Sequence, residues 1–235
     1  MVFKMLLLSL VLCCVLSSTS ANSVHSRSKR GVGTCNLAGV CGQNERGTIP
    51  CAVDRAPTKF DGSPDSVAVL KDECPELFDG VTDPDLCCSE EDVLKMQDIM
   101  KMISTQFADC PDCVQNSKEF ICHFHCAANQ VEFLEIVKQT NQTVDEINYY
   151  INEPSLTQLY SSCEKLPAMQ AFLQMTGCKP GETCGIQDFV KAMGLTAPFK
   201  INAFLSKDDE KIVVNGNPGN AVKFLIKQGG QCASS

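Results

Sequence analysis

The chain has 235 residues, enough for one large domain or two small ones. It contains 16 Cys and no Trp, and its 28 acidic against 20 basic residues give a net charge of −8. An acidic chain offers no basic surface for phosphate backbones or anionic lipid headgroups, so the composition argues against nucleic acid and membrane surfaces as partners.

The first 21 residues are typical of a secretory signal peptide. A short basic start, Met1–Lys4, is followed by an apolar run over Met5–Leu16 and by small residues at Thr19 and Ala21, where cleavage is expected. The alternative is a signal anchor that stays in the membrane, but the run is too short to span a bilayer comfortably, and no later stretch approaches that length. We expect a secreted, extracellular protein with no membrane span.

A possible pro-segment covers residues 22–30. The basic stretch Arg27–Arg30 lies directly before Gly31 and is of the kind that processing proteases of the secretory pathway cut. An unprocessed basic tail is the alternative. Removal of residues 1–30 would leave 16 basic and 28 acidic residues, a net charge of −12.

Cysteine is the dominant feature of the mature chain. Cys13 and Cys14 lie in the signal, and the remaining 14 form an even set in an oxidising compartment, which predicts seven disulfides. Zinc binding is the competing interpretation, because two residues separate Cys110 from Cys113 and because His123 and His125 lie among cysteines. A thioredoxin-like use of the Cys110/Cys113 pair is disfavoured, since no alternating strand–helix pattern surrounds it.

Residues 31–84 are rich in Gly and Pro, which interrupt every short apolar run, so this half is expected to depend on its cysteines. From 89 to 193 the pattern is helical. One helix should begin after an N-cap at Ser89, and a second should cover about 112–137. The capping-box spacing of Thr143–Glu146 predicts a third helix through Ile151. Pro154 and Pro167 suit the first turns of two more, and a last helix around 185–193 should end at Gly194.

After Gly194 the apolar period changes to two. Runs around 199–205, 212–214 and 222–226 are expected to form a small sheet. Helices followed by a sheet, instead of alternating with one, favour the α+β class. We predict one disulfide-rich α+β domain over residues 31–235, with its helices packed on a small C-terminal three-stranded sheet.

Motifs for nucleotide binding, serine hydrolysis or metalloprotease chemistry are missing, and the mature chain has only His123 and His125 as histidines. We therefore expect a binding protein with no catalytic residue, no cofactor and no metal, not an enzyme. Asn141-Gln142-Thr143 is a single sequon, which predicts a surface turn with glycosylation at Asn141.

The order of the cysteines resembles the N-terminal sterol-binding domain of the Niemann-Pick type C membrane cholesterol transporter. The similarity extends over residues 35–232 and includes segments without cysteine. The matching features are Cys35-x5-Cys41, Cys51, Cys74-Pro75, Cys87-Cys88, Cys110-Pro111-x-Cys113, Cys122-x3-Cys126, Asn141–Thr143, Tyr149-Tyr150, Tyr160–Cys163 and Ala197–Ile201.

The resemblance implies a disulfide pairing that the spacing of the cysteines does not determine. In this pairing every one of the 14 cysteines has a partner. The implied pairs are Cys35–Cys87, Cys41–Cys51, Cys74–Cys122, Cys88–Cys126, Cys110–Cys232, Cys113–Cys163 and Cys178–Cys184.

The resemblance also implies a closed apolar pocket between helices and sheet, which takes a sterol with its hydroxyl group innermost. Such a pocket needs apolar walls and very few polar groups. For each wall residue, ordinary core is an equal alternative. The implied ligand-binding residues are Leu37, Ile121, Tyr149, Phe199 and Ile201 as walls and Asp92 as the polar contact.

This chain departs from the family where the sterol hydroxyl is held. The family has Asn, Gln and Glu there, and the corresponding positions are Pro50, Asp92 and Val40. The family also exchanges sterol with a small soluble partner, and its apolar pair at that surface is replaced by Thr176 and Gly177. These changes leave the identity of the ligand and of any protein partner for ligand transfer open.

Our first hypothesis is a secreted, monomeric carrier of a sterol or a similar rigid apolar molecule, such as a carotenoid or another isoprenoid. The alternative is a secreted protein-interaction factor that keeps the scaffold without a ligand. The two differ in a simple observable, because only the carrier should be stabilised by its ligand.

Overall fold

The computed structural model describes residues 33–78, 80–179, 182–208, 210–224 and 232. The expected signal peptide (1–21) and pro-segment (22–30) lie outside these residues. Among the described residues, no helix combines the length and the apolar character that crossing a membrane requires.

The chain begins with an antiparallel hairpin of β1 (Cys35–Asn44) and β2 (Gly47–Arg55). The glycines that suggested only turns are compatible with strand here because the pairing is irregular. Gly39, with a φ of +65°, lies where the register shifts between Ala38 and Val40, and such a bulge accommodates a glycine without strain. The turn-rich segment is therefore partly a strand pair.

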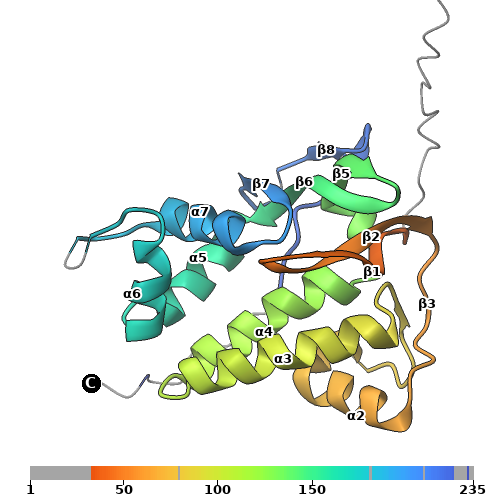
Figure 1. Cartoon of the computed structure of the whole chain (residues 1–235), viewed down its shortest axis with the longest axis horizontal. Coiled ribbons are helices and arrows are strands. Elements are labelled where there is room, and N and C mark those ends of the chain that lie inside the picture. The colour runs from red at the N-terminus through yellow and green to blue at the C-terminus, as the bar shows by residue number, and fades with distance from the viewer. Residues whose placement is uncertain (1–32, 79, 180–181, 209, 225–231, 233–235) are drawn as a thin grey trace, which may run out of the picture.

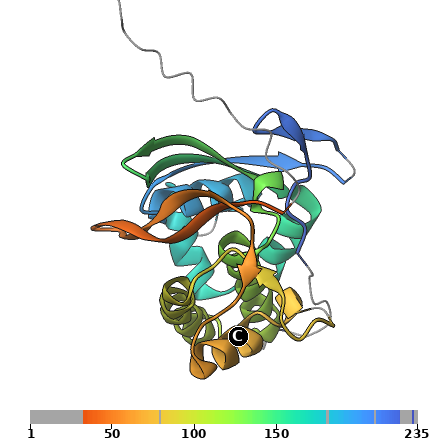
Figure 2. The same ribbon diagram turned by 90° about the vertical axis from the view of Figure 1, so that its right-hand side faces the viewer.

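The central strand of the main sheet is β6 (Thr143–Asn152). It pairs antiparallel with β5 (Leu134–Thr140), parallel with β7 (Lys200–Ser206), and antiparallel with β2 at its start, where Thr143 is opposite Cys51. The sheet thus has five strands, in the order β1-β2-β6-β5 with β7 also beside β6. The strands cross the upper part of Figure 2, and the first three described helices of the chain lie below them.

The helix predicted from Thr143 through Ile151 is wrong, because this segment is β6. The turn before it explains the difference: Asn141 and Gln142 both have positive φ values, 49° and 69°, which form a tight turn between antiparallel strands. The side chains of Ile147, Tyr149 and Ile151 are then buried in alternation, as one face of a strand requires.

The helices form two groups (Figure 1). The helices α2, α3 and α4 lie on one side of the molecule, and α5, α6 and α7 lie together on another. Ser89 is the N-cap of α3 in a capping box, as predicted, and Pro154 and Pro167 lie in the first turns of α5 and α6. The bounds are α2 (Pro64–Glu73), α3 (Glu90–Gln106), α4 (Pro111–Cys126), α5 (Glu153–Cys163), α6 (Pro167–Gln174) and α7 (Ile186–Thr196).

Two helix boundaries differ from expectation. The second helix ends at Cys126, not near 137, because the chain continues into a short 3-10 turn, η2 (Gln130–Glu132), and then β5. Gly194 does not end the last helix, which continues to Thr196. Short elements complete the first half of the chain: β3 (Thr58–Lys59), η1 (Pro75–Phe78) and β4 (Asp85–Leu86).

The α+β, disulfide-rich domain is confirmed, but the small three-stranded C-terminal sheet is not. β7 joins the main sheet, and β8 (Ile212–Val214) pairs with β9 (Asn217–Gly219) in a separate hairpin. In the run expected at 222–226, Val222 forms an isolated parallel bridge with Ile151, and residues 225 and 226 lie outside the described residues. β7 can pair parallel with β6 because the chain between them, which includes α5, α6 and α7, forms the crossover that parallel strands require.

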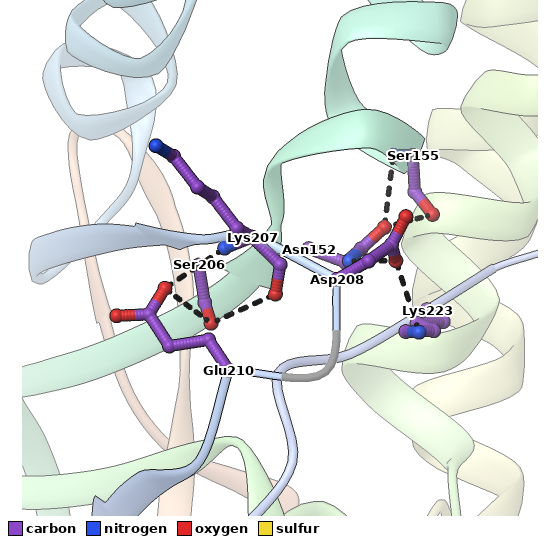
Figure 3. A network of polar contacts seen from close by, with 7 residues as sticks. All are labelled: Asn152, Ser155, Ser206, Lys207, Asp208, Glu210 and Lys223. Carbon is purple, nitrogen blue, oxygen red and sulfur yellow. Dashed lines mark hydrogen bonds and ion pairs between the residues drawn. The ribbon is translucent and has the colours of Figure 1, made fainter.

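A polar network holds the C-terminal segment against the end of β6 (Figure 3). Asp208 accepts a hydrogen bond from Nδ2 of Asn152 at 3.0 Å and pairs with Nζ of Lys223, also at 3.0 Å. These contacts lower the pKa of the Asp208 carboxyl group. Asn152 itself is buried and caps α5 by accepting from the backbone N–H of Ser155 at 3.0 Å.

Candidate functional site

Five of the six residues expected to bind a ligand belong to one apolar cluster between the main sheet and the helices. Leu37, Tyr149 and Phe199 are buried in it, and Ile121 and Ile201 are only partly buried at its edge. They come from β1, α4, β6 and the start of β7, segments far apart in the sequence. The fold therefore brings the proposed wall residues together.

The register of β6 and β7 explains how two of these residues come to lie side by side. Ile147 is paired with Ile201, and two residues later Tyr149 is paired with Ala203, in parallel register. Since alternate residues of a strand share a face, these four side chains lie on the same side of the sheet. Ile147 is fully buried, which identifies this side as the inner one.

Tyr149 is surrounded by aromatic rings. The ring centroids of Phe124, Phe120 and Phe133 lie 5.2, 5.8 and 6.1 Å from that of Tyr149. Phe120 and Phe124 are four residues apart on α4 and so share a helix face. Phe120, Phe124 and Phe133 were not among the predicted site residues, although the i, i+4 spacing of Phe120 and Phe124 was a signal for the first two.

Asp92, the sixth residue, has a different environment. It is 7% exposed, and its Oδ2 atom accepts hydrogen bonds from the backbone N–H and the hydroxyl of Ser89 and from the backbone N–H of Gly39, each at 2.8 Å. This oxygen therefore completes the cap of α3 and joins the helix to β1. Its geometry is that of a structural carboxylate in the first turn of a helix.

The three positions that the family uses for the sterol hydroxyl do come together. Val40 is directly opposite Pro50 across the β1–β2 hairpin, and Gly39, next to Val40, donates to Asp92. Two of the three side chains are apolar here and have no group that forms a hydrogen bond. Val40 and Pro50 therefore offer no side-chain hydrogen bond to a polar ligand group.

His125 lies near Asp92 at the C-terminal end of α4. Burial lowers the pKa of His125, and the negative charge of Asp92 opposes this effect in part. His123, two residues earlier, also has a lowered pKa because of burial, and its Nε2 atom lies 3.7 Å from Oε2 of the buried Glu119. Both imidazoles are therefore kept neutral more readily than in water.

A surface pocket of about 380 Å³ lies elsewhere, between α4, η2 and the C-terminal segment. None of the six expected residues lines it, although Phe133 also contacts the ring of Tyr149. Its lining is polar and apolar in about equal parts and it is partly open to solvent, so we do not assign the apolar ligand to it. The lining residues are His123, Asn129, Phe133, Asn220, Ala221, Val222 and Lys223.

The seven disulfides join the same pairs that the resemblance implies. The sulfurs of Cys110, Cys113, Cys122 and Cys126 are bonded to other cysteines, so these thiols are not open to zinc. In the part of the chain that the structure describes, no group of three or more His, Cys, Asp or Glu side chains could hold a metal ion. The pairs are Cys35–Cys87, Cys41–Cys51, Cys74–Cys122, Cys88–Cys126, Cys110–Cys232, Cys113–Cys163 and Cys178–Cys184.

The sequon lies at the tip of the β5–β6 hairpin. Asn141 and Gln142 are exposed, and the hydroxyl of Thr143 donates to the carbonyl of Cys41 at 3.1 Å. The amide of Asn141 is therefore open to a glycosylating enzyme, and glycosylation there stays a prediction.

Comparison with known proteins identifies relatives that match two thirds to three quarters of this chain. The chain is 27% identical over 176 residues to NPC intracellular cholesterol transporter 1 homolog 1b of Drosophila melanogaster, which covers 67% of this chain and 14% of the relative. It is 24% identical over 195 residues to NPC intracellular cholesterol transporter 1 of Sus scrofa, covering 74% and 15%.

The chain thus spans about a seventh of the length of these curated relatives. A model of the family described as Niemann-Pick C1 N terminus matches residues 32–232. With this match over most of its length, the chain belongs to the Niemann-Pick C1 N-terminal family.

Proposed function

We propose that this protein is a secreted carrier that holds a sterol, or a similar rigid apolar molecule such as a carotenoid or another isoprenoid, in its apolar interior. The observation that carries the proposal is the convergence of Leu37, Ile121, Tyr149, Phe199 and Ile201 into one cluster. The curated relatives are named as cholesterol transporters, which supports a sterol-like ligand. The predicted signal peptide and the seven disulfides support secretion.

The partly buried members of the cluster support a ligand site over an ordinary core. Ile201 on β7 and Ile121 on α4 keep part of their apolar surface exposed at the edge of the cluster, where ordinary core residues would be covered. Covering apolar surface contributes about 25 cal/mol per Å², so an apolar molecule that shields these side chains gains affinity from each of them. Apart from the Tyr149 hydroxyl group, the residues of the proposed wall are aliphatic or phenyl side chains, which favours binding over catalysis.

The changes at Val40 and Pro50 support an apolar ligand whose recognition depends on shape and area more than on one hydroxyl group. Each lost hydrogen bond weakens binding by about 0.5–1.5 kcal/mol, and apolar contact can offset this amount. The carrier would act alone or with a protein partner to which it transfers its ligand. Thr176 and Gly177, in place of an apolar pair, argue against transfer to the partner that the family uses.

The direct test is organic extraction and mass spectrometry of the protein secreted by its native source. A stoichiometric sterol or isoprenoid is the expected result. Ile201→Ser should lose the bound molecule, whereas Phe204→Ser should keep it, because Phe204 lies on the outer face of the same strand and is 46% exposed. Protein that is empty, and that gains no thermal stability from sterols or isoprenoids, would overturn the proposal and favour the protein-interaction factor.

A further inference from the structure

One polar atom of the apolar cluster has no partner. Tyr149 is 2% exposed, and its hydroxyl group forms no hydrogen bond with any of the residues that the structure describes. Tyr160 provides a contrast, because it is buried to a similar degree but its hydroxyl donates to the carbonyl of Cys184 at 2.5 Å. The Tyr149 hydroxyl is thus an exception to the rule that buried polar groups are paired.

Such a group is costly to the fold. A buried polar group without a partner costs about 1–3 kcal/mol, and phenylalanine at the same position would avoid this cost. The strand geometry holds Tyr149 in this position, because the alternation of β6 points its side chain toward the rings of Phe120 and Phe124. The next residue, Tyr150, instead stacks against Phe204 on the outer face. The cost is recovered if a bound molecule supplies the missing partner.

We propose that the Tyr149 hydroxyl group forms a hydrogen bond with the single polar group of the bound apolar ligand. This inference rests on the proposed carrier function and narrows its ligand to molecules that carry an oxygen, such as sterols and oxygenated isoprenoids, as opposed to pure hydrocarbons. Tyr149 would do here what the side chains at Val40 and Pro50 cannot do, because neither of those offers a donor or an acceptor.

The chemistry of the group fits this role. Burial raises the pKa of Tyr149 well above its ordinary value, so the hydroxyl stays neutral throughout the physiological range. A neutral phenol can donate to a carbonyl or hydroxyl oxygen and can also accept from a hydroxyl group. It therefore recognises an alcohol or a ketone, and it does not select for a charged headgroup.

The test compares two probes that differ only in the oxygen, cholesterol and its 3-deoxy counterpart cholest-5-ene. The variants are Tyr149→Phe, which removes the buried hydroxyl, and Tyr150→Phe, which removes the hydroxyl of the outward-facing neighbour. We expect wild type and Tyr150→Phe to bind cholesterol about threefold to tenfold more tightly than cholest-5-ene, the range that one hydrogen bond supplies. Tyr149→Phe should bind cholesterol no more tightly than cholest-5-ene, because the sterol hydroxyl then has no partner, and it should melt no lower than wild type without ligand.

The outcomes separate the two proposals. If wild type binds both sterols with equal affinity, or if Tyr149→Phe keeps the preference, the role of Tyr149 is overturned and the carrier function stands. A ligand-free Tyr149→Phe variant that melts well below wild type would mean that the hydroxyl is satisfied within the fold, which also overturns the role. If wild type binds neither sterol, the sterol-carrier function fails and the role of Tyr149 fails with it.

Discussion

The carboxylate of Asp92 accepts a hydrogen bond from the backbone N–H of Gly39 at 2.8 Å, and it thereby joins the first turn of α3 to β1. The same oxygen completes the capping box with Ser89. Asp92→Ala would remove both contacts and leave the N–H of Gly39 without this partner. We expect a loss of about 1–2 kcal/mol in the free energy of unfolding, measured by urea denaturation.

Asp98→Ala is the matched control, because Asp98 lies on the exposed face of the same helix. It should change the stability by less than about 0.5 kcal/mol. Equal losses in the two variants would mean that Asp92 contributes nothing specific to the junction of α3 and β1.

A second junction, between α2 and α3, depends on Glu90. Its Oε1 atom accepts from the backbone N–H of Ser63 at 3.0 Å and from the hydroxyl of Ser66 at 2.7 Å, and these bonds lower the pKa of Glu90 to about 2. A carboxyl group with a lowered pKa stabilises the fold above its ordinary value of 4.5, and this stabilisation is lost as the pH falls toward 2. The stability difference between wild type and Glu90→Gln should therefore be constant above pH 4.5 and shrink below it.

Urea denaturation at a series of pH values measures this difference, with Glu91→Gln as the exposed neighbouring control. A Glu90→Gln difference that stays constant down to pH 2 would contradict the role of the two serine contacts.

The partly buried His125 should give a second response of stability to acid. Its pKa is lowered from 6.5, so below pH 6.5 the unfolded chain binds a proton that the folded chain takes up less readily. Stability should therefore fall as the pH drops below 6.5. His125→Gln should reduce this fall, and His123→Gln should reduce it as well, because burial also lowers the pKa of His123. Wild type and both variants with the same stability profile between pH 7.5 and 5 would count against this account.

The disulfides should contribute unequally to stability. Cys110–Cys232 joins residues 122 positions apart, and Cys178–Cys184 joins residues only 6 apart. In the chain-entropy model, loss of the first bridge costs about 5 kcal/mol and loss of the second about 2 kcal/mol. Paired Cys→Ser variants compared by urea denaturation should show this order, and equal costs would contradict it.

Peptide mapping under non-reducing conditions checks the pairing itself. It should recover Cys110 linked to Cys232. A map in which Cys110 is joined to a cysteine other than Cys232 would disprove this pairing.

The cysteines explain why so much of the fold was accessible from the sequence. Their order carried the resemblance, and the resemblance supplied both the pairing and five residues that the structure gathers in one cluster. Local signals also predicted α3, α5 and α6, because Ser89, Pro154 and Pro167 act within one helical turn.

The errors came where contacts distant in the sequence decide the structure. The stretch Thr143–Glu146 has the residue types and spacing of a capping box, but it belongs to β6, which pairs with β5 on one side and with β7 on the other. β7 likewise joins β6, more than fifty residues earlier in the chain, instead of the strands that follow it. The lack of a partner for the Tyr149 hydroxyl could not be predicted at all, because it depends on three rings from other elements.

The exposed hairpin tip at Asn141 makes glycosylation a prediction that can be tested separately from ligand binding. Protein secreted from eukaryotic cells should lose mass on treatment with peptide N-glycosidase. Asn141→Asp removes the sequon and should abolish the loss of mass. Asp also tolerates the positive φ of 49° at this position, so the turn should keep its shape and the variant should still be secreted.

Thr143→Ser is the matched control, since serine preserves the sequon and a hydroxyl that can donate to the carbonyl of Cys41. It should keep the loss of mass. The prediction is wrong if wild type loses no mass, and also if Asn141→Asp still loses the mass of a glycan, which would place the modification on another residue.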